Sequence, residues 1–315
     1  MKPALAGNLQ LLNSEENVGR ELEPLASAPG RRAAGSLGLA LRSYWGPLVV
    51  AALLLLLYAG SLVDLFRVLL ADPNSSHGLL IPPIAGFLLW RRRKRLAALP
   101  KATEFRGLVL VFLGVVLLPL GAAAEIPAMA PFSLLVVAGG LVWHVWGNQL
   151  MRALLFPYLY LFFTIPWPGL LVETLTFHLQ LISAKSAALV IGLLGMPVVR
   201  EGVEIQLGGY KFEVAAPCSG IRSMAALMAL GALCAYLLKG TRLRRIALFL
   251  LVPPLAMIGN AFRIVVILLI AAKWGTEAAN GFYHEFSGLV LFLATFLLLL
   301  AAAQLMGMKQ LREEI

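Results

Sequence analysis

The run IALFLLVPPLAMIGNAFRIVVILLIAA, residues 246–272, decides the fold class, because it is long, apolar and carries a single charge, Arg263. A helix needs about 20 apolar residues to cross the hydrocarbon core of a membrane. Similar runs recur along the chain, and we expect about eight membrane spans. They lie at 45–66, 77–91, 106–124, 131–147, 151–167, 219–238, 244–272 and 286–306. The predicted fold is an all-α polytopic membrane bundle.

The composition supports a membrane protein. Of 315 residues, 60% are hydrophobic and 13% are charged, whereas a soluble domain has about 45–50% apolar and about 25% charged residues. The net charge of +10 is typical of basic cytoplasmic loops in a membrane protein, so we expect the lipid bilayer and no nucleic acid as a partner. Two cysteines and four histidines argue against a disulfide scaffold or zinc cluster, and we expect no metal and no cofactor.

Basic residues predict the orientation. They gather at 31–42, 91–95, 152, 239–245 and 309–312, and the positive-inside rule places these segments in the cytoplasm. Both termini are then cytoplasmic. The expected organisation is a disordered N-terminal tail at 1–44, a transmembrane domain at 45–308 and a short C-terminal tail at 309–315.

The segment 170–195 must begin and end outside if its neighbours are placed correctly. We expect an amphipathic helix that lies at the outer interface or dips into the bundle without crossing. After it, apolar residues alternate with polar ones across 203–214, around the pair Gly208-Gly209. Period two around such a turn predicts a small extracytoplasmic β-hairpin.

The hairpin leads into Cys218, at the start of the predicted helix 219–238. Unpaired N–H groups and the helix dipole favour a thiolate at such a position. The alternative is a small apolar packing residue, which suits Cys234. That residue lies about 24 Å further along the same helix, too far to form a disulfide with Cys218.

Arg263 is costly inside an apolar run and is therefore a candidate functional residue. About 28 Å of helix separates it from Arg244, which matches the bilayer core of about 30 Å. Arg263 should thus emerge near the outer interface, level with Cys218, where Asn260 on the same helix face could orient the guanidinium. The alternative is an interfacial arginine that snorkels.

His284 precedes the last span, and the topology places it outside at the same level. A thiolate, an imidazole and a fixed cation are the minimal set for acyl transfer. His77, at the outer mouth of the second span, either binds substrate or is structural. Arg222 and Glu213 are candidates for substrate contact or are surface charges. No HExxH, Walker or GxSxG pattern occurs, so zincin, nucleotide-binding and α/β-hydrolase functions have no support.

Five segments together resemble the exosortase/archaeosortase transpeptidases. They are SHGLLIPPIAGFLLWRRR at 76–93, FTIPWPG at 163–169, VVREGVEIQLGGYKFEVAAPCSGIRSM at 198–224, NAFRI at 260–264 and HEFSG at 284–288. They occur in the family's order and cover most of the membrane portion.

The resemblance implies about eight spans in the bacterial inner membrane and an active site on the extracytoplasmic face. It implies Cys218 as nucleophile, Arg263 as oxyanion or thiolate stabiliser and His284 as general acid/base. Members of this family cleave a C-terminal sorting signal, which consists of a short motif such as Pro-Glu-Pro, a membrane helix and a basic tail. They are thought to join the new carboxyl end to an acceptor, whose identity the sequence does not give.

Two alternatives stay open on the residues alone. A transporter or channel component would use Arg263 and His284 in a substrate or proton path, although the chain lacks the paired halves common in transporters. A cysteine-dependent membrane acyltransferase would form a fatty acyl adduct on Cys218 instead of a peptide adduct.

Overall fold

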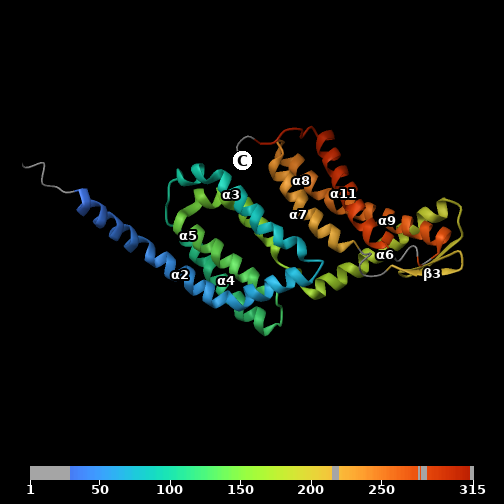
Figure 1. Ribbon diagram of the computed structural model, residues 1–315, viewed down its shortest axis with the longest axis horizontal. Coiled ribbons are helices and arrows are strands. Elements are labelled where there is room, and N and C mark those ends of the chain that lie inside the picture. Colours follow the sequence, from blue (N-terminus) through green and yellow to red (C-terminus); the bar gives the residue numbers. More distant parts are fainter. Residues whose placement is uncertain (1–28, 215–219, 276, 278–281, 313–315) are drawn as a thin grey trace, which may run out of the picture. The chain divides into compact units, whose positions relative to one another are not determined.

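The computed structural model describes residues 29–214, 220–275, 277 and 282–312, which are mostly helical. The helices are α2 (Pro29–Ala71), α3 (Ile81–Ala97), α4 (Phe105–Ala123), α5 (Met129–Tyr160), α6 (Gly169–Leu193), α7 (Ile221–Leu237), α8 (Arg242–Leu250), α9 (Val252–Trp274) and α11 (Phe282–Leu305), with 3-10 turns η2 (Ser76–Leu80) and η3 (Leu161–Thr164) (Figure 1). The chain divides into two compact units, Met1–Leu57 and Tyr58–Ile315, and both cavities described below lie in the second.

Six helical stretches of the described chain are long and apolar enough to cross a membrane. They are Ala52–Ala71, Phe105–Ala123, Met129–Thr164, Gly169–Leu193, Arg242–Trp274 and Ser287–Leu305, and Ile221–Leu237 is a shorter apolar helix. A multi-pass membrane protein is therefore confirmed, but the expected number of about eight spans is not. The predicted span 77–91 falls on α3, where the cluster at 91–95 makes the helix too polar.

Two of the predicted spans, 131–147 and 151–167, lie in one continuous element that reverses direction. Gly147 interrupts α5 with φ +81° and ψ −175°. The Tyr158 hydroxyl donates to the Leu135 carbonyl over 3.0 Å, although a straight helix would separate these residues by about 34 Å. The second half of α5 therefore folds back along the first.

Helix α6 is a single apolar helix of 25 residues, long enough to cross a membrane, where the sequence predicted a non-crossing segment. Helix α6 runs parallel to α9. Leu179 shares one core cluster with Ala256, and Ile191, further along α6, shares another with Leu268, further along α9. The polar positions that suggested an interfacial helix are too few to offset the apolar residues between them.

A three-stranded antiparallel sheet follows α6, with strands β1 (Val198–Glu201), β2 (Glu204–Leu207) and β3 (Tyr210–Glu213) in that order. The predicted hairpin is β2–β3, closed by Gly208-Gly209, both at positive φ. Strand β1 is an addition that the sequence prediction missed. Ile205 is fully buried in the cluster that includes Leu268, so the sheet is anchored on α9.

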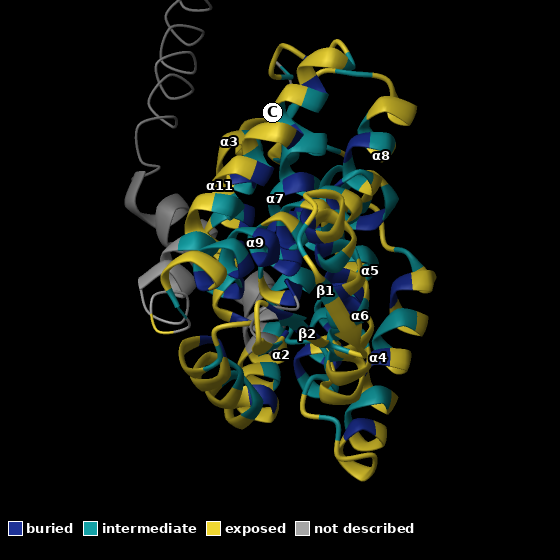
Figure 2. Ribbon diagram, turned by 90° about the vertical axis from the view of Figure 1, so that its right-hand side faces the viewer, coloured by how far each residue is buried: buried dark blue, intermediate teal, exposed yellow. Residues whose placement is uncertain are grey.

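Helices α7, α8, α9 and α11 share one apolar core that includes Leu227, Leu248, Val252 and Leu299. Figure 1 shows these helices next to one another, and Figure 2 shows buried positions on α7 and α9 beside exposed outward faces. This packing holds the ends of α7, α9 and α11 in fixed relation.

Parts of the two predicted tails are among the described residues. Residues 29–44 belong to α2, and 1–28 lie outside the described residues. At the other end, the Lys239 N–H donates to the Gln310 carbonyl over 2.7 Å, and the Arg312 N–H donates to the Leu237 carbonyl over 2.8 Å. The first part of the segment 309–315 is thus paired with the end of α7.

Candidate functional site

A cavity of about 680 Å³ lies between α7, α9, α11 and the turn that precedes α3. Polar side chains gather at this cavity from segments far apart in the sequence. The described polar lining residues are Ser76, His77, Arg222, Ser223, Asn260, Arg263 and Thr295. Among the described lining residues none is Asp or Glu, so their side chains give this cavity cationic character.

The start of α7 meets the middle of α9 at Gly220 and Asn260. Gly220 caps α7 with φ +80°, and a Cβ atom there would lie 2.8 Å from Asn260 Cγ. Asn260 is 6% exposed, and its Nδ2 donates to Ser183 Oγ of α6 over 3.0 Å. One buried amide therefore holds together three segments at the cavity wall.

The α9 arginine meets the first part of α11. Arg263 Nε donates to Ser287 Oγ over 3.2 Å. A Cβ atom on Gly288 would lie 3.7 Å from Arg263 Nη2, an ordinary van der Waals distance, so the guanidinium lies next to the α11 backbone at this position. The Arg-containing and His-containing motifs are thus in direct contact through described residues.

Arg222 joins α7 to the turn before η2. Its Nε donates to the Pro73 carbonyl over 2.9 Å, although the two residues are distant in sequence. The side chain is exposed and lines the cavity together with Pro73. This bond fixes the orientation of the guanidinium at the cavity edge.

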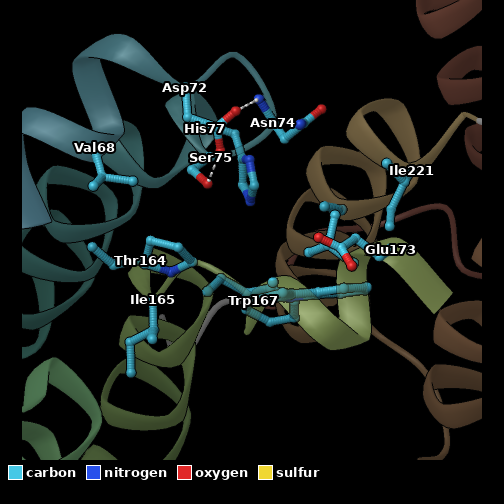
Figure 3. Close-up of a pocket in the computed structure, with 15 residues that line it drawn as sticks. Val68, Asp72, Asn74, Ser75, His77, Thr164, Ile165, Trp167, Glu173 and Ile221 are labelled. Atoms are coloured by element: carbon cyan, nitrogen blue, oxygen red, sulfur yellow. Dashed lines mark hydrogen bonds between the residues drawn. The ribbon is translucent and has the colours of Figure 1, made fainter. Parts of the chain in front are cut away.

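His77 lines the large cavity and also a second one of about 290 Å³. The turn before it is closed by Asp72, which accepts from the Asn74 N–H over 3.0 Å and from Ser75 Oγ over 2.6 Å. Figure 3 shows the His77 ring pointing into the second cavity. Burial lowers the pKa of the imidazole from its ordinary value, although the hydrogen bond to the Asn74 backbone and the Asp72 carboxylate act in the opposite direction.

Residues of the FTIPWPG segment form part of the wall of the second cavity. Residues 163–167 line it, and Trp167 and Glu173 lie across from His77 (Figure 3). Two motifs that the resemblance rests on, 76–93 and 163–169, therefore meet at this cavity. His77 is shared by both cavities.

Four of the predicted site residues come together in the large cavity: His77, Arg222, Asn260 and Arg263. Glu213 does not join them in the described structure, since it is exposed at the end of β3, paired with Glu204.

Two of the predicted catalytic residues, Cys218 and His284, lie wholly or partly outside the described structure. Cys218 lies outside the described residues. The backbone of His284 belongs to the first turn of α11, and its side chain lies outside the described part.

Several residues that organise the site were not predicted from the sequence. Ser183 holds Asn260, Ser287 holds Arg263, and the Pro73 carbonyl holds Arg222. Ser287 could have been found from the sequence, because it lies within the HEFSG segment. Ser183 could not, because a serine on an apolar helix resembles any small packing residue. No group of side chains suited to a metal ion occurs among the described residues.

Comparison with protein families gives one match. The family model described as transmembrane exosortase (Exosortase_EpsH) matches residues 69–301. The search of the curated proteins found no match, and neither did the search of the solved structures. The matched region contains every lining residue of the large cavity, every lining residue of the second cavity except Val68, and all the motif segments described above. The match covers well over half of the chain, and the chain therefore belongs to the transmembrane exosortase family.

Proposed function

We propose that this chain is a membrane-embedded cysteine transpeptidase that cleaves the C-terminal sorting signals of exported proteins. Membership of the exosortase family implies processing of such signals. The observation that carries the finer proposal is the junction of Gly220 with Asn260 and of Gly288 with Arg263. These contacts support a common site for Cys218, Arg263 and His284.

The chain positions support the proposed catalytic roles. Cys218 is two residues from Gly220 in the sequence, and two residues of chain span at most about 7 Å. His284 precedes Ser287 by three residues on α11, a spacing that shares one helix face. Ser287 in turn contacts Arg263. We therefore assign Cys218 as nucleophile, Arg263 as oxyanion stabiliser and His284 as general acid/base.

In the first half-reaction, the Cys218 thiolate attacks the scissile carbonyl carbon and forms a C–S bond. The carbonyl electron pair moves to oxygen, where the Arg263 guanidinium and backbone N–H groups at the start of α7 stabilise the charge. When the tetrahedral intermediate collapses, the C–N bond breaks. The His284 imidazolium gives its proton to the leaving nitrogen, which departs with the C-terminal helix of the signal.

In the second half-reaction, an acceptor amine or water attacks the thioester carbonyl. Neutral His284 takes the proton of this nucleophile, the C–S bond breaks, and the thiolate is restored. An amine gives a new amide bond, and water gives a carboxylate.

The cavity has features suited to the signal motif. Arg222 is held at its edge by Pro73, and His77 lies nearby on the same lining. A cationic cavity without described acidic lining residues suits a motif that carries a carboxylate, because opposite charges attract strongly where water is excluded. Arg222, His77 and Asn260 are therefore proposed as substrate contacts. Glu213 lies apart and is proposed as a contact for residues upstream of the motif.

The proposed location is the bacterial inner membrane, with the cavity at the extracytoplasmic face. The basic clusters at 91–95 and 239–245 support a cytoplasmic position for the C-terminal ends of α3 and α7, which point away from the cavity. A membrane-impermeant thiol reagent applied to intact cells should label Cys218 and spare Cys234. Labelling of Cys218 only after lysis would invert this orientation.

The processing test uses a cognate substrate protein with a tagged sorting signal, produced together with the enzyme. Cys218→Ala should abolish cleavage and leave the protein in the membrane, and Cys234→Ala should process normally. Full cleavage by the Cys218→Ala variant would exclude the cysteine mechanism. Mass spectrometry of the Cys218 adduct in the native enzyme should find a peptide, whereas a fatty acyl group would indicate an acyltransferase.

A further inference from the structure

A cluster of two arginines and two aromatic rings lies at the end of α7 opposite the proposed active site. It consists of Arg92 of α3, Tyr236 of α7, Arg312 of the C-terminal segment and Phe156 of α5. The Arg92 and Arg312 guanidinium carbons lie 5.2 and 5.8 Å from the centroid of the Tyr236 ring. We call these four residues the inner cluster.

Both guanidiniums face the same side of Tyr236. Phe156 stacks on one face of this ring, with 3.7 Å between the centroids and 6° between the planes. Since that face is covered, the two cations approach the other. An anion on that side of the ring would lie close to both guanidiniums and would be attracted to each of them.

The inner cluster also contains donors without a protein partner. The Arg92 Nε and the Tyr236 hydroxyl are buried and have no hydrogen-bond partner within the described chain. Arg92 forms no ion pair with a described carboxylate. Buried polar atoms normally have a partner, and a bound group with several acceptor oxygens would supply one to both.

The cluster is built in a defined way. The Arg312 N–H donates to the Leu237 carbonyl over 2.8 Å, and Leu238 and Leu311 form a β-bridge. The C-terminal segment is thereby fixed beside the last turn of α7. Arg312 is thus attached directly next to Tyr236.

We propose that the inner cluster binds a phosphate group, supplied by an anionic phospholipid headgroup or by free phosphate. Guanidinium forks match phosphate oxygens in a bidentate manner, and a tyrosine hydroxyl adds one further donor. The cluster lies next to the basic run 91–95, at the end of α3 predicted to be cytoplasmic, where phospholipid headgroups of the inner leaflet are at hand. The site is distinct from the cavity at the other end of α7 and does not depend on the proposed peptidase activity.

The test measures thermal unfolding of the detergent-solubilised full chain during titration with dioctanoyl phosphatidylglycerol, dioctanoylglycerol or inorganic phosphate. A ligand that binds the native state raises the unfolding temperature with concentration. Phosphatidylglycerol should stabilise the protein, and dioctanoylglycerol, which lacks phosphate, should not. Stabilisation by inorganic phosphate at equal concentration would identify free phosphate as the ligand, whereas a response to phosphatidylglycerol alone would identify the lipid.

Arg92→Lys is the decisive variant, with Arg93→Lys as the matched control. Both keep the charge of the basic run, and Arg93 lies over exposed Trp90 at 4.6 Å. Arg92→Lys should weaken phosphatidylglycerol binding about tenfold, because it loses the guanidinium fork, and Arg93→Lys should change it less than about twofold. Tyr236→Phe, which removes only the hydroxyl, should weaken binding about fivefold.

Equal effects of Arg92→Lys and Arg93→Lys would overturn the proposal, because they would indicate general attraction to a basic surface. Absence of stabilisation by both phosphatidylglycerol and inorganic phosphate would overturn it as well.

Discussion

Gly220, the residue that caps the start of α7, lies directly against the buried Asn260 side chain of α9, so closely that a Cβ atom would be 2.8 Å from Asn260 Cγ. Gly220 also has φ +80°, which side chains with a Cβ atom rarely adopt. The position therefore requires glycine for two separate reasons. This contact joins the Cys-Ser-Gly segment to the Asn-x-x-Arg segment.

Gly220→Ala should lower processing of a cognate substrate at least about tenfold, because the added methyl group displaces Asn260 from the cavity wall. Gly195→Ala is the matched control, because Gly195 also has φ +80° but a Cβ atom there would meet no other atom within 4 Å. Both variants should lose about 1–2 kcal/mol of stability from backbone strain. Initial rates of cleavage, normalised to folded enzyme, check this, and equal rates for both variants would contradict the role of the contact.

Ser183→Ala should destabilise the protein by about 0.5–1.5 kcal/mol, because it removes the hydrogen bond that Asn260 Nδ2 donates to Ser183 Oγ. Ser186, on the same helix and half-buried, provides the control, and Ser186→Ala should change stability by less than about 0.5 kcal/mol. Thermal unfolding in detergent measures both. A Ser183→Ala variant as stable as the control would show that the hydrogen bond contributes little.

Arg263→Lys should reduce kcat about 10²–10³-fold and affect KM little, because lysine keeps the charge but loses the planar donors that Ser287 orients. The control is Arg67→Lys, an exposed arginine paired with Asp64 over 3.2 Å, which should retain normal kcat. Steady-state kinetics with a sorting-signal peptide separate the two parameters. A change confined to KM would make Arg263 a substrate-binding residue and not an oxyanion stabiliser.

His77 should make stability depend on pH below its ordinary pKa of about 6.5. Burial lowers the pKa of the folded state, so the unfolded chain binds the proton more readily in the window just below 6.5. Stability should therefore be complete above that value and fall as the pH decreases through the window. His77→Gln should flatten this dependence between about pH 7.5 and 5.5, measured by thermal unfolding, and His178→Gln, at an exposed position, should leave it as steep as in the native chain.

The sequence predicted those features that arise from local patterns. The turn at Gly208-Gly209 was found as expected, because alternating residues and a glycine pair specify a hairpin locally. Helix rise and bilayer thickness predicted that Arg263 and the start of α7 lie at one level, and Arg263 and Gly220 line the same cavity.

Other features depend on distant contacts that no local pattern records. The reversal at Gly147 lies at the break that hydropathy predicted between the spans 131–147 and 151–167, but the bond from Tyr158 to the Leu135 carbonyl that stabilises it requires the tertiary structure. Strand β1 pairs with β2 through residues 198–201, and the Gly202 turn, with φ +61°, was the signal that could have found it. The bonds from Ser183 and the Pro73 carbonyl require the tertiary structure.

The most direct test of the account asks whether Cys218 and position 284 share one pocket. In the background Cys234→Ala, the variant His284→Cys should be cross-linked to Cys218 by a short bifunctional thiol reagent in native membranes. Leu305→Cys, at the exposed far end of α11, should not be cross-linked. Failure at position 284, or equal cross-linking at both positions, would contradict a common site for the thiol and the imidazole.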